Sequence, residues 1–160
     1  MSGSRSPALR VIRGLHDEQA VGCLTHTGRE KVSNKTIIHP PGFFDPSPRG
    51  YSHGVRVGNM LFIAGQTGTE RGLVEPMNLE TQTRRTFARI QAVLEEAGGS
   101  LDDLVTMTVY MTDIRFSEEF VRLRAEILKR DFPGSALIGV HRLVPPDALL
   151  EIQAIAVLGD

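Results

Sequence analysis

The chain has 160 residues, of which 41% are hydrophobic and 23% are charged, values typical of one globular domain with a single core. Its 18 Lys and Arg residues nearly balance its 19 Asp and Glu residues, and without clustered cations no nucleic-acid partner is expected. No segment approaches the roughly 20 apolar residues of a membrane-spanning helix, so no membrane partner is expected either.

The first 35 residues show no sustained helical or strand periodicity. We assign residues 1–35 to an N-terminal extension and residues 36–160 to a single domain. A disordered tail, a cap over an assembly and the product of an upstream start codon are all open readings of the extension. Four prolines between residues 40 and 48 then fix backbone angles and remove N–H donors, which predicts an extended, turning loop.

Next, the sequence predicts a strand over 60–64, where the apolar run MLFIA lies between two turn signals. The turn-rich segment 66–77 is expected to be a connection, and a helix begins at Leu79. Its apolar positions recur every three or four residues and therefore share one face. Gly98-Gly99 is typical of a helix end. The residues of the apolar face are Thr83, Phe87, Ile90, Leu94 and Ala97.

The second half predicts a strand over 104–112, a helix that begins at Ser117, and two strands over 136–143 and 149–158. Pro133-Gly134 is expected to stop the helix. In the first of these strands one face holds Val105, Met107, Val109 and Met111. The last strand alternates between an apolar face and a face that carries Glu151. This order of elements predicts an α+β fold in which helices cover one face of a sheet.

The chain lacks the phosphate-binding, zinc-protease and serine-hydrolase motifs. Its single cysteine, Cys23, forms neither an internal disulfide nor a zinc site, and the five histidines lack the spacing of a metal pair. We therefore expect no metal and no cofactor. A single cysteine and the absence of an apolar secretory signal favour a cytoplasmic location.

Glu151 is the most informative polar residue, because its strand is otherwise rich in Leu, Ile and Ala. Its carboxylate either reaches a cleft or needs a buried partner. Partial burial would raise its pKa toward a value useful for proton transfer, although an outward-facing ion pair with a cation is the more common arrangement. In the loop before the strand over 60–64, Tyr51 could position a ligand or a water, or could anchor the loop through its ring. His53 could carry a proton at neutral pH, or could be a hydrogen-bonded surface group.

Two further positions can be interpreted either as functional or as purely structural. Gly65 follows the strand over 60–64 and could present backbone N–H groups to an anion, or could simply end the strand. Arg142 could bind a ligand carboxylate, although an ion pair with Asp147 is the simpler expectation.

Three segments resemble the Rid (YjgF) family of reactive-intermediate deaminases, also called the L-PSP family. They are GYSHGVRVGNMLFIAGQTG, TRRTFARIQAVLEEAGGSLDDLVTMTVYMTDI and HRLVPPDALLEIQAIAVL. The likeness extends from about residue 37 to residue 158, which is nearly the whole chain after the extension. The combination of segments is specific for the fold, although no single segment is.

This resemblance implies a chorismate-mutase-like α+β subunit, with one mixed sheet and two helices on one face. It also implies a homotrimer with ligand clefts between subunits, in which a neighbour would cover the apolar face of Val105, Met107 and Val109. Imine deaminases of the family hydrolyse small enamines and imines to ketoacids and ammonia without a cofactor. The expected partners are therefore a small metabolite and further copies of the chain.

The resemblance also implies roles for individual residues. Tyr51 matches the tyrosine of the family's GPY segment, and Glu151 matches the glutamate of its EIEAIA strand. Glu151 is then expected to activate the attacking water, and Tyr51 to hold the substrate or the water. Gly65 matches the glycine of the SGQ turn, whose N–H faces the substrate carboxylate. We also assign His53, beside Tyr51, to substrate binding.

One departure from the family pattern bears on the substrate. Imine deaminases of the family carry PAR at the start of the penultimate strand, and that arginine binds the substrate carboxylate through two hydrogen bonds. Here the segment reads PGS, so Ser135 occupies the arginine position, and a hydroxyl cannot replace a guanidinium. Leu137 and Gly139, expected on the same strand face beside His141, predict a larger and less cationic site.

These observations lead to two main hypotheses. The first is a cofactor-free hydrolytic deaminase for an enamine or imine other than a simple 2-iminoacid, with Glu151 and Tyr51 as catalytic residues and Gly65, Ser135, Leu137 and His53 as substrate-binding residues. The alternative is a trimer that binds a small metabolite without turnover. A ribonuclease, the third reading, is the weakest, because the charge is balanced and no basic, aromatic-rich groove is evident.

Overall fold

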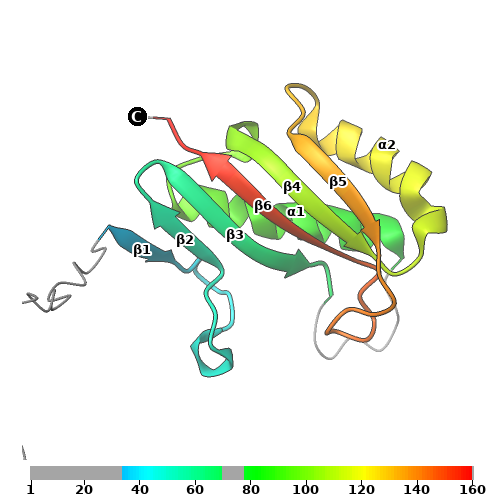
Figure 1. Cartoon of the computed structure of the whole chain (residues 1–160), viewed down its shortest axis with the longest axis horizontal. Coiled ribbons are helices and arrows are strands. Elements are labelled where there is room, and N and C mark those ends of the chain that lie inside the picture. Colours follow the sequence, from blue (N-terminus) through cyan, green and yellow to red (C-terminus); the bar gives the residue numbers. More distant parts are fainter. Residues whose placement is uncertain (1–33, 70–77, 160) are drawn as a thin grey trace, which may run out of the picture. The chain divides into compact units, whose positions relative to one another are not determined.

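A computed structural model describes residues 34–69 and 78–159 of the chain (Figure 1). In this part, six strands form one sheet in the order β1-β2-β3-β6-β4-β5. All neighbouring strands are antiparallel except β4 and β5, which are parallel. The sheet is therefore mixed, as predicted. Its strands are β1 (Lys35–Ile38), β2 (Gly54–Val57), β3 (Met60–Thr67), β4 (Leu104–Met111), β5 (Gly134–Gly139) and β6 (Leu150–Val157).

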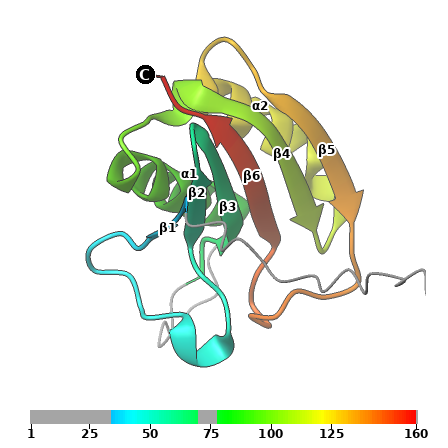
Figure 2. The same ribbon diagram turned by 60° about the vertical axis from the view of Figure 1, so that its left-hand side comes forward.

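Two helices, α1 (Leu79–Glu96) and α2 (Ser117–Leu128), cover one face of this sheet (Figures 1 and 2), which confirms the predicted α+β fold. The side chain of Asn78 caps α1 by accepting a hydrogen bond of 2.8 Å from the N–H of Thr81. Gly98, in the left-handed conformation, ends it. The core lies between the helices and the sheet, and its largest buried side chains are those of Phe87, Phe120, Leu61, Ile90, Leu94 and Met107.

The faces of β4 differ from the prediction at one residue. Met107, Val109 and Met111 are buried beneath the helices, whereas 51% of Val105 is exposed. The reason is an irregularity in the β4–β6 ladder between Leu104 and Thr106, which takes Val105 out of the alternation. The expectation that a neighbouring subunit covers an apolar face of Val105, Met107 and Val109 is therefore wrong, because the chain's own helices bury Met107 and Val109.

Several element boundaries also differ from the prediction. The extension and the proline-rich loop after it were expected to contain no strand, but β1 forms there by pairing with β2. β3 continues to Thr67 and includes Gly65. β5 covers 134–139 where 136–143 was expected. These differences arise where pairing with a distant strand, and not the local pattern, decides the structure.

The predicted extension over 1–35 lies almost wholly outside the described residues, and β1 begins at its last residue, Lys35. The division into an extension and a domain over 36–160 stays a prediction. Within the described ranges, neither helix is long and apolar enough to cross a bilayer.

Candidate functional site

Glu151 is the second residue of β6 and lies between two strands. It pairs in register with Thr67 on β3 and with Tyr110 on β4. Its neighbours Leu150 and Ile152 are fully buried toward the helices, so the alternation of the strand places the Glu151 side chain on the opposite, open face of the sheet. There the side chain is half-buried.

The Glu151 carboxylate lies directly over the backbone of Gly65. A Cβ atom at Gly65 would collide with Oε1 of Glu151, so the carboxylate occupies the space that any other side chain would need. The β3–β6 ladder passes from the pair Ile63–Ala154 to the pair Gln66–Ile152. β3 therefore holds one extra residue, a β-bulge at the position of Gly65. The bulge and the glycine together make room for the carboxylate.

No hydrogen bond or ion pair within the described ranges involves this carboxylate. The predicted alternative, an ion pair with a cation, is therefore not what the structure contains. Burial raises the pKa of Glu151 above its ordinary value, because desolvation disfavours the charged form. A partly desolvated carboxyl group without a partner is suited to accept and return a proton.

Tyr51 lies in the segment that leads into β2, and 40% of it is exposed. The carbonyl of His53 accepts a hydrogen bond of 2.9 Å from the N–H of Ala64. Because β2 and β3 run antiparallel, Tyr51 lies two residues farther toward the end of β3 that contains Gly65. The backbone thus brings Tyr51 to the same end of the sheet as Gly65 and Glu151.

His53 is 3% exposed, so it is not a hydrogen-bonding group on the surface, which was one of the two expectations for it. Its Nε2 lies 3.0 Å from the carbonyl oxygen of Phe44 and donates a hydrogen bond to it. The rings of Phe43, Phe44 and Tyr51 pack against its ring at centroid distances of 5.0, 5.0 and 6.1 Å. His53 therefore anchors the loop that carries Tyr51, and its assignment to substrate binding stays a prediction.

The structure does not bring Ser135 and Leu137 to the face that carries Glu151. They pair in register with Met107 and Val109, which are buried toward the helices, so their side chains lie on that same side. Leu137 packs against the core, and Nη1 of Arg124 on α2 donates a hydrogen bond of 3.0 Å to the Ser135 hydroxyl. Their roles in a substrate cleft stay predictions.

The expected ion pair between Arg142 and Asp147 does not form in the described part of the chain. Asp147 instead contributes its backbone carbonyl, which accepts a hydrogen bond of 2.8 Å from Nε2 of Gln82 on α1. Across residues 34–69 and 78–159, no group of three potential metal ligands is close enough to hold a metal ion.

Two polar residues of α1 near the site were not singled out from the sequence. Gln82 is 1% exposed and bonds to the loop before β6. Arg89 donates hydrogen bonds of 2.7 and 2.9 Å to the carbonyls of Thr67 and Thr69 at the end of β3. Gln82 lies four and eight residues before the buried Thr86 and Ile90. A polar amide in that apolar stripe is the signal that could have identified it.

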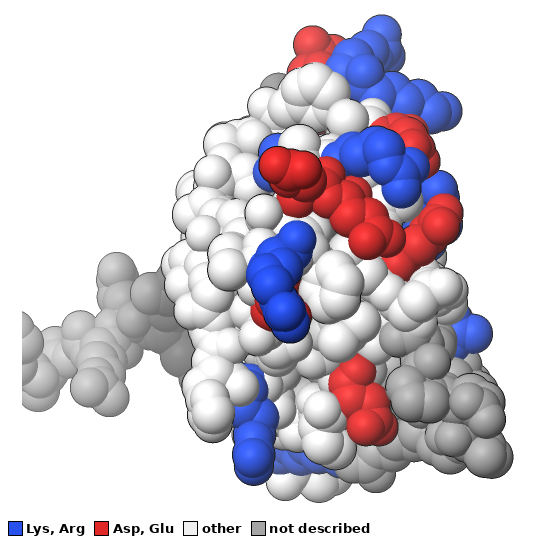
Figure 3. Space-filling model, turned by 90° about the vertical axis from the view of Figure 1, so that its right-hand side faces the viewer, with Lys and Arg blue, Asp and Glu red and all other residues white. Residues whose placement is uncertain are grey.

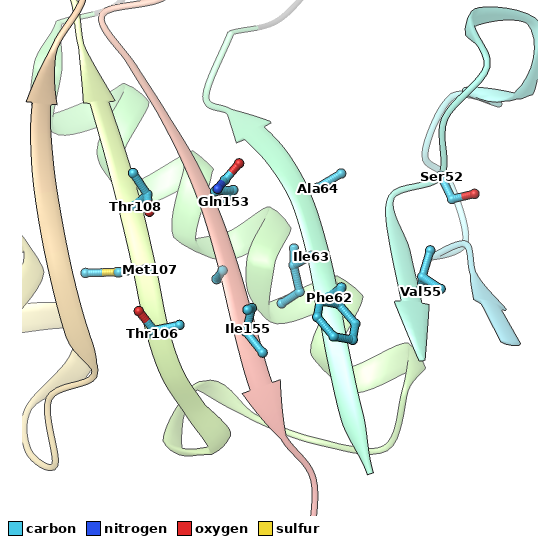
Figure 4. A pocket seen from close by; sticks show the side chains of 11 residues that line it. Ser52, Val55, Phe62, Ile63, Ala64, Thr106, Met107, Thr108, Gln153 and Ile155 are labelled. Atoms are coloured by element: carbon cyan, nitrogen blue, oxygen red, sulfur yellow. The ribbon is translucent and has the colours of Figure 1, made fainter. Parts of the chain in front are cut away.

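The open face of the sheet also carries a shallow groove of about 350 Å³ next to this site (Figure 4). Gln153, two residues after Glu151 and on the same face of β6, is part of its lining. The groove is lined mainly by apolar side chains over β2 and β3 and by threonine side chains on β4. The lining side chains include Val55 of β2, Phe62 of β3, Ile155 of β6, and Thr106 and Thr108 of β4.

Comparisons with known proteins agree with this fold. Residues 45–158 match the family model described as Endoribonuclease L-PSP. A RutC family protein of Pyrococcus abyssi is 39% identical over 114 residues, which cover 69% of this chain and 89% of that protein. A 2-iminobutanoate/2-iminopropanoate deaminase of Dermatophagoides farinae is 30% identical over 132 residues, which cover 79% of this chain and 99% of that protein.

A solved structure gives the same result at the level of the fold. A Mycobacterium tuberculosis protein described as a member of the YjgF/YER057c/UK114 family superposes with a TM-score of 0.68 at 31% identity. The superposition covers 78% of this chain and 99% of that one. The chain therefore belongs to the L-PSP family, also known as the YjgF or Rid family.

Proposed function

We propose that the protein is a cofactor-free hydrolytic deaminase for a small enamine or imine other than a simple 2-iminoacid. The observation that carries this proposal is the half-buried Glu151 carboxylate, which has a raised pKa and no partner in the described part of the chain. The relative from Dermatophagoides farinae, which is named 2-iminobutanoate/2-iminopropanoate deaminase, supports the reaction class.

In this reaction an enamine is first protonated on carbon to give an iminium ion. Glu151 then accepts a proton from water as the water oxygen attacks the iminium carbon, which gives a carbinolamine. The same carboxyl group returns the proton to the amine nitrogen. The C–N bond then breaks as the carbinolamine hydroxyl gives up its proton, which the departing ammonia takes, so that the carbonyl product and ammonium leave. A raised pKa suits both halves of this cycle, because Glu151 must act first as a base and then as an acid.

The other site residues would bind the substrate and the water. The Tyr51 hydroxyl holds the substrate or the attacking water, and Gly65 offers its backbone N–H. Within one subunit Ser135 lies on the other face of the sheet from Glu151, so it would meet the substrate only across the proposed subunit interface. There it does not supply the two-pronged contact that an arginine gives to a carboxylate. Loss of such a contact costs about 2 to 5 kcal/mol of binding free energy, so a simple 2-iminoacid is a poor substrate.

We also propose that the active form is a homotrimer with substrate clefts between subunits. The open face of the sheet exposes several large apolar side chains, and such patches mark interaction surfaces. A second copy of the chain would cover the groove on this face and bring further residues toward Glu151. The exposed apolar residues of this face include Met60, Phe62 and Val157.

The deaminase proposal is tested by measuring ammonia release from imines and enamines generated in the assay by an amino-acid oxidase or a pyridoxal-phosphate enzyme. Wild type is compared with Glu151→Gln, and with Glu118→Gln as a control on the exposed start of α2. We expect Glu151→Gln to lose activity by about a hundredfold or more and the control to keep it. Equal hydrolysis rates of wild type and Glu151→Gln on every substrate would contradict the proposal.

The substrate class is tested by adding Ser135→Arg to the same assay. We expect this variant to gain activity on 2-iminoacids. Because Arg124 already donates to Ser135, the new guanidinium would meet a like charge, so Ser135→Arg is also made together with Arg124→Leu. Strong wild-type activity on 2-iminoacids would contradict the inference drawn from Ser135.

A trimer that binds a metabolite without turnover is the second candidate, because Ser135 occupies the position of the arginine in the family pattern that the sequence resembles. Retention of a ligand for hours without product would support it. A ribonuclease is not favoured, because basic and acidic side chains are interspersed on the face shown in Figure 3. Arg84 and Arg122 also both form ion pairs with Glu126.

A further inference from the structure

The start of β6 is held by a buried amide of α1. Nε2 of Gln82 donates a hydrogen bond of 2.8 Å to the carbonyl of Asp147, and its Oε1 accepts one of 2.8 Å from the N–H of Leu149. The two bonds lie on either side of Ala148, which is 3% exposed. They fix the backbone immediately before β6, two residues ahead of Glu151.

The same helix also fixes the end of β3, which lies beside Glu151 in the sheet. Thr67, its register partner on β3, accepts a hydrogen bond from Arg89 through its carbonyl. The next residue, Gly68, packs so closely on the backbone of Gln82 that a Cβ there would collide with the Gln82 carbonyl. α1 is thus a common support for both segments that flank Glu151.

Among the described residues, few other hydrogen bonds hold the connection before β6. One is the bond of 3.0 Å that the N–H of Ala148 donates to the carbonyl of Pro145. Thr112 donates to the Leu149 carbonyl from its N–H at 3.0 Å and from its hydroxyl at 3.3 Å, while Val144 is 95% exposed. A buried amide is costly when it is unsatisfied, so Gln82 and this loop specify each other's position.

We propose that Gln82 is a positioning residue: its two hydrogen bonds fix the start of β6 and thereby keep the Glu151 carboxylate half-buried over Gly65. The effect of Gln82 on catalysis rests on the proposed deaminase function. The effect of Gln82 on the position of the Glu151 carboxylate does not rest on it. The residues in register with Glu151 are Tyr110 and Thr67, of which Tyr110 alone is titratable.

The test uses Gln82→Met, which removes the hydrogen bonds to Asp147 and Leu149 at similar volume, and Gln91→Met as the matched control. Gln91 lies on the same helix, and its side chain bonds only to Glu95 among the described residues. The Glu151 carboxyl group is titrated by carbon-13 NMR, with its signal identified by its loss in Glu151→Gln. We expect the pKa of Glu151 to fall toward its ordinary value in Gln82→Met and to stay raised in Gln91→Met.

A conservative variant separates positioning from folding. In Gln82→Glu the introduced carboxyl group, when protonated, can donate and accept as the amide does, so it should keep the pKa of Glu151 raised while it is neutral. If Gln82→Met does not fold, Gln82→Asn takes its place. This variant keeps the amide but shortens its reach, so we expect the pKa of Glu151 to fall as it would in Gln82→Met.

Activity is the second readout. We expect kcat to fall by about tenfold to a hundredfold in Gln82→Met, as for a misplaced catalytic group, with a smaller change in KM. A lower melting temperature with an unchanged Glu151 titration would overturn the positioning role. If wild type hydrolyses no imine or enamine, the deaminase proposal fails, but the titration still decides the role of Gln82.

Discussion

At the scale of single residues, the site depends on Gly65, which has no side chain, and on the Glu151 carboxyl group, which has no hydrogen-bond or ion-pair partner among the described residues. Gly65 leaves space on β3, and the Glu151 carboxylate fills it. Gly65→Ala would push the carboxylate away from the bulge. Because the obstructing atom is the end of a flexible side chain, we expect the variant to fold but to lose deaminase activity by about tenfold or more.

Gly134→Ala is the control for this prediction. The nearest atom to a Cβ at Gly134 would be 3.7 Å away, which is ordinary contact. Circular dichroism melting verifies that both variants fold, and ammonia release measures their activity. Equal activity of Gly65→Ala and Gly134→Ala would show that the carboxylate does not need its position over Gly65.

The unpaired Glu151 carboxyl group also makes stability depend on pH. Its pKa is raised in the folded protein by desolvation, so the folded state holds this proton more tightly than the unfolded state does. As the pH rises from the ordinary glutamate pKa of about 4.3 through the raised folded pKa, stability is lost. Above this pH range Glu151 is ionised in the folded protein, and the loss of stability caused by its desolvation is complete.

Glu151→Gln removes this cost because the amide does not ionise. We therefore expect the variant to gain melting temperature relative to wild type at pH 7, with little or no gain at pH 4. Thermal melts of the two proteins across this range measure the difference. A gain that does not change with pH would mean that Glu151 does not titrate abnormally in the folded state.

At the scale of elements, α1 supports the site from the far side of the sheet. It begins at the Asn78 cap, four residues before Gln82. Asn78→Ala removes the acceptor for the Thr81 N–H, so we expect a loss of about 1 kcal/mol in the free energy of unfolding. Asn59→Ala, in the turn between β2 and β3, is the control, and urea denaturation measures both. An equal effect of the two substitutions would contradict the capping role.

Most elements were predictable because they are local. The stripe of α1 from Thr83 to Ala97 is buried as expected, since helical periodicity depends on neighbours along the chain. β1 was not predictable, because it exists only through its pairing with β2, about twenty residues later. The exposure of Val105 follows from an irregularity in the ladder with β6, which the β4 sequence does not encode alone.

The site was predictable only in part. The apolar strand around Glu151 indicated an unusual carboxylate, and the structure adds that it lacks a partner in the described residues and lies over Gly65. The apolar stripe of α1 could have indicated a buried amide at Gln82. Its partners were not predictable, because its hydrogen bonds join α1 to a loop more than sixty residues away. The side of the sheet on which Ser135 lies depends on its register with β4, which a single strand sequence does not fix.

At the scale of the whole molecule, the two faces of the sheet differ in what covers them. Helices bury one face, while the open face exposes 41% of Phe62 beside the groove. If identical copies cover this face, Phe62→Asp would bury a charge at each interface, which is strongly unfavourable. We expect wild type to show three times the mass of one chain in light scattering, and Phe62→Asp to be a monomer.

Because the proposed clefts lie between subunits, the same variant should also lose deaminase activity while keeping its helical and strand signal in circular dichroism. Val121→Asp is the matched control, since Val121 is similarly exposed, at 45%, but lies on α2. It should remain trimeric and active. A monomeric wild type would contradict the proposed trimer. If Phe62→Asp is a monomer with full activity, the wild type is still a trimer, but one subunit contains the whole site.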